Sequence, residues 1–192
     1  MMRYEQIKRW FDVTLGVVLL GICAFPMLLI MIAIKRTSVG PILFWSSRVG
    51  IDNHLFRMPK FRTMRIDTPP MATHLLKNPE AYVTSIGVFL RKTSLDELPQ
   101  LISVIKGDMS IVGPRPALYN QDDLVSLRTA RGIHRIPPGV TGWAQINGRD
   151  ELPIPVKVGF DEYYLNRHSM AFDIKIVALT IFKVVRKEGV NH

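Results

Sequence analysis

Two adjacent acids, Asp96 and Glu97, stand in the run 93–100 (TSLDELPQ), and Arg115 follows between two prolines. Carboxylates can hold a divalent metal ion, and the fork of an arginine can grip a phosphate. The prolines fix the backbone around Arg115, which lowers its freedom before binding. These residue types are what a phosphoryl-transfer site needs, although a plain turn is the alternative at Arg115.

The segment around the two acids predicts the start of a helix. Ser94 followed three residues later by Glu97 is typical of a capping box. Asp96 and Glu97 would then lie in the first turn, where exposed amides and the helix dipole favour negative charge. Asp96 would stay ionised there, as a nucleophile or a metal ligand must. Gly107 is expected to end this helix. The alternative is that both acids only cap it.

A long apolar segment lies near the N-terminus. Residues 13–34 carry no charge, and as a helix they would be ~33 Å long against a hydrocarbon core of ~30 Å. Basic residues flank both ends, and Pro26 predicts a kink near the middle. From these residues alone, a re-entrant hairpin and a kinked spanning anchor are equally compatible with the segment. A cleaved signal peptide is disfavoured, because no small-residue cleavage site precedes Lys35.

The composition points to an anionic partner. The chain has 25 Lys and Arg against 16 Asp and Glu, a net charge of +9. Such a surplus suits nucleic acid, acidic lipid or a phosphorylated substrate, and the alternative is general solubility charge. No nucleic-acid-binding motif is recognisable. The lone Cys23 excludes an intramolecular disulfide and a cysteine-based zinc site.

Three further stretches could contribute to a site or to a membrane surface. Residues 55–65 interleave basic and apolar side chains, which could line an anionic pocket, contact lipid headgroups or form a solvated strand. Residues 137–149 are rich in turn formers and hold Gln145, Trp143 and Arg149, which could bind a nucleotide, although a lone glycine-rich loop is a weak signal. Residues 169–187 look amphipathic and could rest in the membrane interface or face the core.

Several motifs in a fixed order give the chain a resemblance to a known family, the bacterial sugar transferases, which are monotopic polyprenyl-phosphate phosphoglycosyl transferases. The resemblance covers nearly the whole chain, whose short length is similar to the minimal form of the family. The motifs are Lys8 and Arg9 before a proline-broken apolar helix, 60–64 (KFRTM), 94–100 (SLDELPQ), 106–116 (KGDMSIVGPRP), 138–149 (PGVTGWAQINGR) and 160–164 (FDEYY).

This resemblance implies a reaction and its partners. Such enzymes move a sugar 1-phosphate from a nucleotide diphosphate sugar, usually a UDP-sugar, to undecaprenyl phosphate and release UMP. The family uses Mg²⁺ and a covalent intermediate, and its reaction is the first membrane step of bacterial glycan assembly. It works at the cytoplasmic face of the bacterial inner membrane, in contact with membrane lipids. A nucleic-acid partner is not expected, and a homodimer is left open.

The resemblance also implies roles for individual residues. Asp96 would be the nucleophile and a Mg²⁺ ligand, and Glu97 would act as a base or position the acceptor phosphate. The remaining expected contacts are with substrate phosphate for Arg115, Lys60 and Arg62, with the nucleotide for Gln145 and Arg149, and with lipid headgroups for Lys8 and Arg9.

The expected architecture is an α+β fold, mainly helical with a small β element. By analogy with the family, residues 1–36 would form a re-entrant helix-break-helix hairpin at Pro26, and residues 37–192 a catalytic domain with interfacial amphipathic helices. Family members often carry serine before the proline, whereas Phe25 stands there in this chain. A membrane-tethered basic binding or scaffold protein without turnover is the alternative function. The sugar and the glycan pathway are not readable from the sequence.

Overall fold

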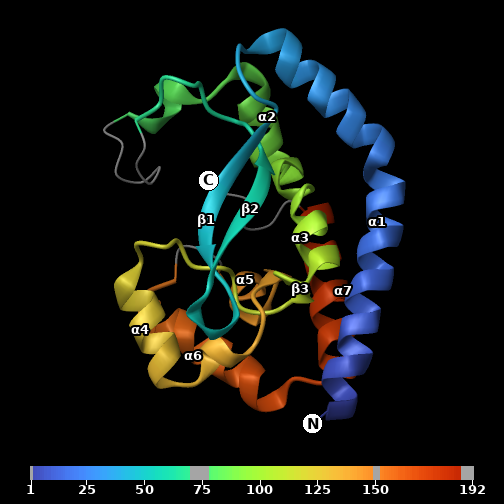
Figure 1. The fold of residues 1–192 in the computed structure, drawn as a ribbon, viewed down its shortest axis with the longest axis vertical. Helices are drawn as coiled ribbons and strands as arrows, with labels where there is room; N and C mark the ends of the chain where they lie inside the picture. The colour runs from blue at the N-terminus through green and yellow to red at the C-terminus, as the bar shows by residue number, and fades with distance from the viewer. Residues whose placement is uncertain (1, 70–77, 149–151, 187–192) are drawn as a thin grey trace.

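Helices dominate the structure, a computed structural model that describes residues 2–69, 78–148 and 152–186 (Figure 1). Short 3₁₀ turns lie between them, at η1 (Ile51–Asn53), η3 (Pro79–Tyr82), η4 (Leu95–Glu97) and η5 (Ile133–Arg135). The helices are α1 (Met2–Thr37), α2 (Ser85–Thr93), α3 (Gln100–Lys106), α4 (Asp122–Ala130), α5 (Trp143–Ile146), α6 (Ile154–Arg167) and α7 (Met170–Arg186).

The β structure is small. Strands β1 (Leu43–Val49) and β2 (Leu55–Phe61) form an antiparallel hairpin, and the short strands β3 (Ser110–Val112) and β4 (Gly139–Thr141) pair in parallel. The predicted α+β class, mainly helical with a small β element, is therefore confirmed. The parallel pair matters for the site, because the chain leaves β3 directly into the Arg115 segment.

Helix α1 is the longest element and follows one side of the molecule. It stays helical from Met2 to Thr37 with Pro26 inside, and Figure 1 shows it bending along its course. Its segment Tyr4–Thr37 contains an 18-residue stretch with a mean hydropathy of 2.9 and is long and apolar enough to cross a membrane. A membrane helix therefore fits this segment, and the bend agrees with the expected effect of proline.

Both halves of α1 also pack against the rest of the protein. Leu15 and Leu19 contact the central core, which includes Val104, and the second half buries Ile30 and Ile34 in a separate apolar cluster. The opposite side of the helix exposes apolar side chains, the surface that lipid would cover. These exposed residues are Val17, Val18, Ile22, Phe25, Leu28, Leu29 and Ile32.

The acids 96 and 97 lie in a tight connection between two helices. Ser94 adopts a left-handed backbone (φ 54°) at the end of α2, and its side chain makes no capping hydrogen bond to the following turn. The predicted capping box is therefore wrong, and α3 begins only at Gln100. Gly107 ends α3 as expected, with φ 103° and its amide donating to the carbonyls of Ser103 and Val104.

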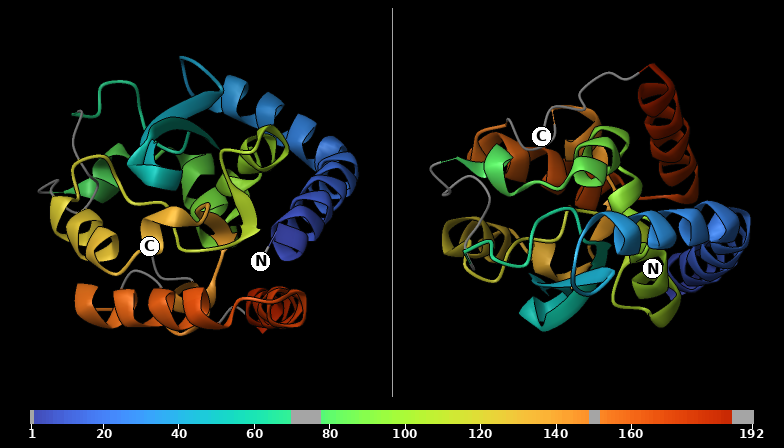
Figure 2. Two further views of the ribbon diagram at one scale, coloured as in Figure 1. Left: turned by 60° about the horizontal axis from the view of Figure 1, so that its bottom comes forward. Right: turned by 90° about the horizontal axis from the view of Figure 1, so that it is seen from above.

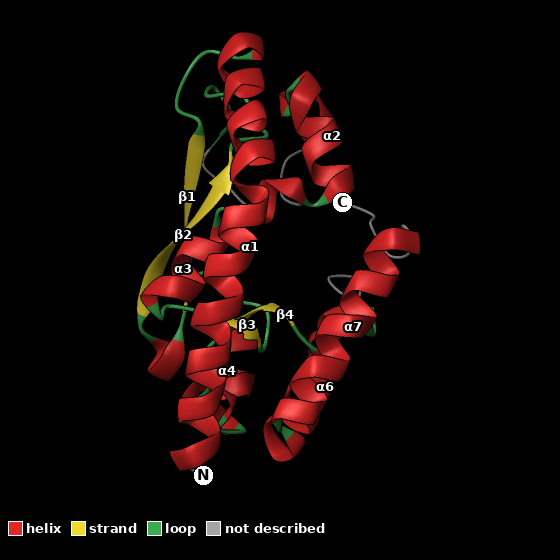
Figure 3. Ribbon diagram, turned by 90° about the vertical axis from the view of Figure 1, so that its right-hand side faces the viewer, coloured by secondary structure: helices red, strands yellow, loops and turns green. Residues whose placement is uncertain are grey.

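Helix α7 has two different sides. Asp173 and Ile176 are completely buried, whereas Ile174, Ile181, Phe182 and Val184 are exposed. Figures 2 and 3 show the C-terminal end of α7 standing apart from the body. The amphipathic character expected of residues 169–187 therefore holds for the described part of α7, and its exposed apolar side is available to a lipid interface.

Candidate active site

Three separate elements bring four charged side chains together. Lys60 comes from β2, Asp96 and Glu97 from η4, and Arg115 from the segment after β3. We call these four residues the dyad cluster. Two carboxylates and two cations from distant parts of the chain thus share one site, as the sequence predicted for Asp96, Glu97, Lys60 and Arg115.

Glu97 is the centre of the ion pairs. Lys60 Nζ donates to Glu97 Oε1 at 2.6 Å, and Arg115 Nη2 donates to the same oxygen at 3.2 Å. Although burial opposes ionisation, these two cations hold the pKa of Glu97 far below its usual range. The side chain of Arg115 is 28% exposed, so an arriving phosphate can reach its guanidinium.

Asp96 is held differently from its neighbour. It is buried, and no side chain among the described residues donates a hydrogen bond to its carboxylate. Burial raises the pKa of Asp96 to about 6, and the charges of Lys60 and Arg91 oppose that rise. Near neutral pH, Asp96 is thus a mostly ionised carboxylate without a side-chain hydrogen-bond donor among the described residues, which suits a nucleophile or metal ligand.

Arg91 is a residue that the sequence reasoning missed. It lies in the last turn of α2, its Nε donates to Thr63 Oγ1 at 3.0 Å, and its charge lowers the pKa of Asp96. No motif marks Arg91. Its signal in the sequence was only its place as a basic residue five positions before the acid.

The backbone around Arg115 is fixed by close packing of two loops. Gly113 N donates to Thr141 O and Gly139 N donates to Pro114 O, both at 2.8 Å. A Cβ atom on Gly113 would lie 2.5 Å from Pro137 O, and one on Gly139 would lie 2.1 Å from Gly113 N. Only glycine allows this approach, so the two glycine motifs serve to hold the Arg115 segment on β4.

Two of the predicted substrate-binding residues occupy interior positions. Arg62 is buried and donates to the carbonyls of Ser38 and Val39, which anchors the turn after α1. Gln145 is buried beside Gly142, and neither of its amide atoms has a partner among the described residues. The nucleotide role of Gln145 stays a prediction, and Arg149 lies outside the described residues.

The basic residues at the start of α1 also point inward. Lys8 is buried and forms an ion pair with Asp173 at 2.8 Å. Arg9 donates to the carbonyls of Val104 and Ile105 at the end of α3. The structure therefore places Lys8 and Arg9 in contacts with protein, not on the surface expected for headgroup binding.

The indole ring of Trp143, in the segment 137–149, packs against other aromatic rings of the protein. Trp143 stacks on Tyr163 with ring centroids 5.8 Å apart and also contacts Phe172 at 5.0 Å. These contacts join α5 to α6 and α7. The ring that the sequence suggested for stacking a base is thus used in packing.

Asp96 of the dyad cluster fits a magnesium ion that arrives bound to the diphosphate of a nucleotide. Among the described residues no group of three His, Cys, Asp or Glu side chains could hold a metal alone. Mg²⁺ in phosphoryl-transfer sites usually takes one or two carboxylates and completes its shell with substrate phosphates and water. Asp96, ionisable and without a side-chain partner, meets that requirement.

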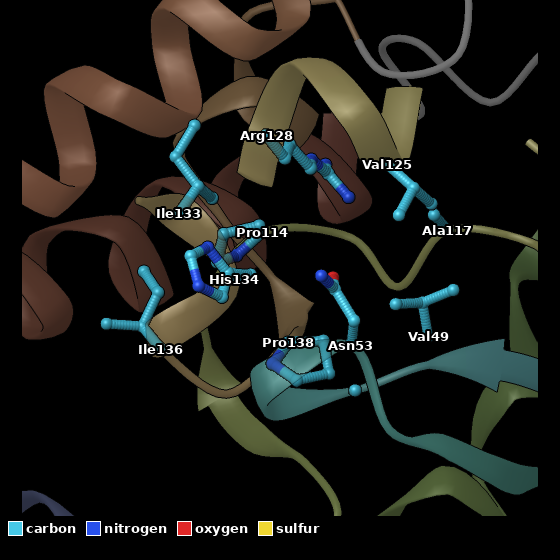
Figure 4. Close-up of a pocket in the computed structure, with 11 residues that line it drawn as sticks. Val49, Asn53, Pro114, Ala117, Val125, Arg128, Ile133, His134, Ile136 and Pro138 are labelled. Atoms are coloured by element: carbon cyan, nitrogen blue, oxygen red, sulfur yellow. The ribbon is translucent and has the colours of Figure 1, made fainter. Parts of the chain in front are cut away.

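A small cavity lies beside the Arg115 segment. Figure 4 shows its walls, which include Pro114, Arg128 and His134. Its volume is about 30 Å³, far below the ~300 Å³ or more of a typical small-molecule pocket. A nucleotide sugar therefore does not fit there, and the exposed side of the dyad cluster is the better candidate.

Comparison with known proteins gives a consistent match. The family model for the bacterial sugar transferases matches residues 3–187. An uncharacterized sugar transferase, EpsL of Bacillus subtilis, is 42% identical over 97% of this chain and 91% of its own length.

Two longer relatives have more specific names. A UDP-glucose:undecaprenyl-phosphate glucose-1-phosphate transferase of Escherichia coli is 40% identical over 92% of this chain. An undecaprenyl-phosphate galactose phosphotransferase of Salmonella typhimurium is 34% identical over 95% of this chain. The alignments span only 40% and 41% of these two relatives.

Proposed function

Because this chain belongs to the bacterial sugar transferase family, we propose that it transfers a sugar 1-phosphate from a UDP-sugar to undecaprenyl phosphate. The products are UMP and a lipid-linked diphosphosugar, the first membrane intermediate of a bacterial glycan. The names of the relatives support the acceptor and the reaction class. The observation that carries the proposal is that two adjacent acids have different surroundings. Glu97 is ion-paired with two cations, whereas Asp96 has no side-chain hydrogen-bond donor among the described residues.

Asp96 is the nucleophile in this proposal. Its carboxylate oxygen attacks the sugar-bearing phosphorus, and the bond from that phosphorus to the bridging oxygen breaks. UMP leaves with the electron pair, and the phosphosugar stays on Asp96 as an acyl phosphate. An oxygen of undecaprenyl phosphate then attacks the same phosphorus and releases the carboxylate. The buried position of Asp96 and its lack of a side-chain partner support this role.

Glu97 positions cations in this reaction. A carboxylate with a strongly lowered pKa is a weak proton acceptor, so positioning is favoured over the role of general base. Glu97 holds Lys60 and Arg115 side by side. Both cations, with Arg91 nearby, then face the charge that develops on the transferred phosphoryl group.

Magnesium belongs to this proposal as the partner of the donor diphosphate. Asp96 would hold it together with diphosphate oxygens, and the ion would supply charge neutralisation for the phosphoryl oxygens. The cations of the dyad cluster supply positive charge from the protein side. Chelation with EDTA and restoration by Mg²⁺ would test this requirement.

A one-sided membrane position is the proposed arrangement of α1. Its first turns are tied to Asp173 and its last turns pack on Phe61 and Leu90, so one body holds both ends. A helix held in this way re-enters the leaflet more easily than it crosses to the other side. The active site would then lie at the cytoplasmic face of the inner membrane. Labelling that placed residue 2 outside and residue 60 inside would overturn this topology.

The test is UMP release by the full chain in reconstituted membranes. The assay would contain Mg²⁺, undecaprenyl phosphate and a panel of UDP-sugars, with Asp96→Asn as the inactive variant. Asp122→Asn, an exposed acid at the start of α4, is the matched control. Release with one donor, lost only in Asp96→Asn, would support the proposal. No release from any donor by folded protein would favour the scaffold function.

A further inference from the structure

The proposed reaction gives no role to the motif at residues 160–164 (FDEYY) on α6. We infer that Asp161, acting through Arg128, positions Arg115 for phosphate binding, an inference that rests on the proposed function for the role of Arg115. Asp161 and Arg128 are positioning residues, because neither side chain belongs to the dyad cluster.

Arg128 connects the motif to the site by a chain of short hydrogen bonds. Its Nε and Nη2 donate to Asp161 Oδ2 at 3.0 and 2.6 Å, and its Nη1 donates to the carbonyl of Arg115 at 2.8 Å. Arg128 is only 8% exposed and Asp161 only 1%. The guanidinium is therefore locked on one side by the carboxylate while its other side fixes the backbone of Arg115.

Helix α6 also contacts the beginning of the Arg115 segment. Tyr164, one turn after Asp161, donates to the carbonyl of Val112 at 3.3 Å and to Asp173 Oδ1 at 2.7 Å. Val112 is thus contacted from α6, Arg115 is held by Arg128 of α4, and Gly113 is fixed to β4 in between. Pro114 and Arg128 also line the same small cavity (Figure 4). The direction of the Arg115 side chain follows from this fixed backbone.

An arginine is specifically required at position 128. Its planar fork can bond the carboxylate and the carbonyl at once, whereas the ammonium group of a lysine cannot reproduce that geometry. A buried ion pair often adds little net stability compared with apolar residues of similar size. Fixing the backbone position of Arg115 therefore explains this buried pair better than a gain in stability does.

The chain offers a matched control next to the pair. Arg131, at the end of α4, bonds Glu162 at 2.7 Å, and the two side chains are 36% and 39% exposed. This second pair joins the same two helices but contacts no residue of the Arg115 segment among the described contacts. Loss of an exposed pair should have little effect.

The experiment compares turnover and UDP affinity in single and double variants. Arg128→Lys should lower kcat by about 10-fold to 100-fold, because a shift of about 1 Å at a positioned group can have that effect. UDP binding should weaken in parallel, and Glu162→Gln should match the wild type within about twofold. The combined variant Arg128→Leu with Asp161→Leu should fold, because no buried charge remains unpaired, yet show the same loss.

The Arg115→Ala background separates positioning from general damage. There, Arg128→Lys should lower kcat and UDP affinity by less than about twofold, because its effect passes through Arg115. An equal loss in both backgrounds, or wild-type UDP affinity in the Leu–Leu variant, would overturn the inference. If the wild type bound UDP but turned over no donor, the proposed function would fail while the affinity cycle still decided this inference.

Discussion

Two buried polar regions of this molecule use similar residues for different ends. The dyad cluster joins Asp96 and Glu97 to Lys60 and Arg115. The second region, here called the anchor network, surrounds Asp173 on α7, whose carboxylate is completely buried. The Asp173 carboxylate accepts hydrogen bonds from Tyr4 at 2.9 Å, Lys8 at 2.8 Å and Tyr164 at 2.7 Å.

The difference lies in how completely each carboxylate is satisfied. In the anchor network every oxygen of Asp173 has a donor from the protein, so the network fixes α1 to α6 and α7. In the dyad cluster one oxygen of Glu97 accepts from two cations, and Asp96 has no side-chain donor among the described residues. A buried carboxylate without side-chain donors weakens the fold but is available to a substrate.

The largest expected effect is the loss of turnover in Asp96→Asn, which should occur without a loss of thermal stability. Asp96→Asn should lower turnover by at least about 10³-fold, as loss of a covalent nucleophile does. Its melting temperature should stay the same or rise, because burial disfavours the ionised carboxyl. Turnover and thermal unfolding of the same preparation would test both statements. Residual turnover above that limit would contradict the assignment of the nucleophile.

The anchor network should show the opposite behaviour. Lys8→Met removes the cation from a buried pair and should lower the free energy of unfolding by about 3 kcal/mol. Turnover per folded molecule should stay within about twofold. Lys35→Met, at the exposed end of α1, should change stability by less than about 0.5 kcal/mol. If Lys8→Met kept full stability but lost membrane binding, the headgroup interpretation would be correct after all.

The pH dependence should report Asp96. Because burial raises its pKa to about 6, the reactive ionised form dominates above that pH and declines below it. The value of kcat/KM should therefore fall about tenfold per pH unit below about 6. A pH profile of the wild type, corrected for unfolding, would check this. An acidic limb of the kcat/KM profile near pH 4 would mean that the Asp96 carboxylate is not desolvated in the free enzyme.

The smallest expected effect concerns Lys60. Its positive charge lowers the pKa of Asp96, so Lys60→Met should move the acidic limb of the kcat/KM profile above pH 6. Arg57→Met, an exposed position on the same strand, should leave the limb in place. An unchanged limb in Lys60→Met would show that the two groups are not electrostatically coupled.

The sequence predicted the dyad cluster better than the anchor network for a physical reason. Asp96, Glu97 and Arg115 lie in motifs whose residue types indicate their chemistry. The resemblance to the family assigned Lys8 to lipid headgroups, and its observed partner, Asp173, lies 165 residues away in the sequence. Charge can be read from the sequence, whereas the position of the opposite charge depends on the tertiary fold.

Local signals also failed where distant contacts compete with them. Ser94 and Glu97 have the spacing of a capping box, yet Glu97 pairs with Lys60 and Arg115. Two long-range ion pairs outweigh one local hydrogen bond of a helix start. The pairing of β3 with β4 was not predicted either, because strands of three residues leave almost no periodic pattern.

The most direct test of the central claim is the mass of the intact protein after incubation with its UDP-sugar and Mg²⁺, without undecaprenyl phosphate. We predict a single added sugar phosphate on the wild type, located at Asp96 by peptide mapping, with one UMP released for each adduct. Asp96→Asn should gain no mass. UMP release that occurs only when the lipid acceptor is present, with no adduct at any stage, would contradict the covalent role of Asp96.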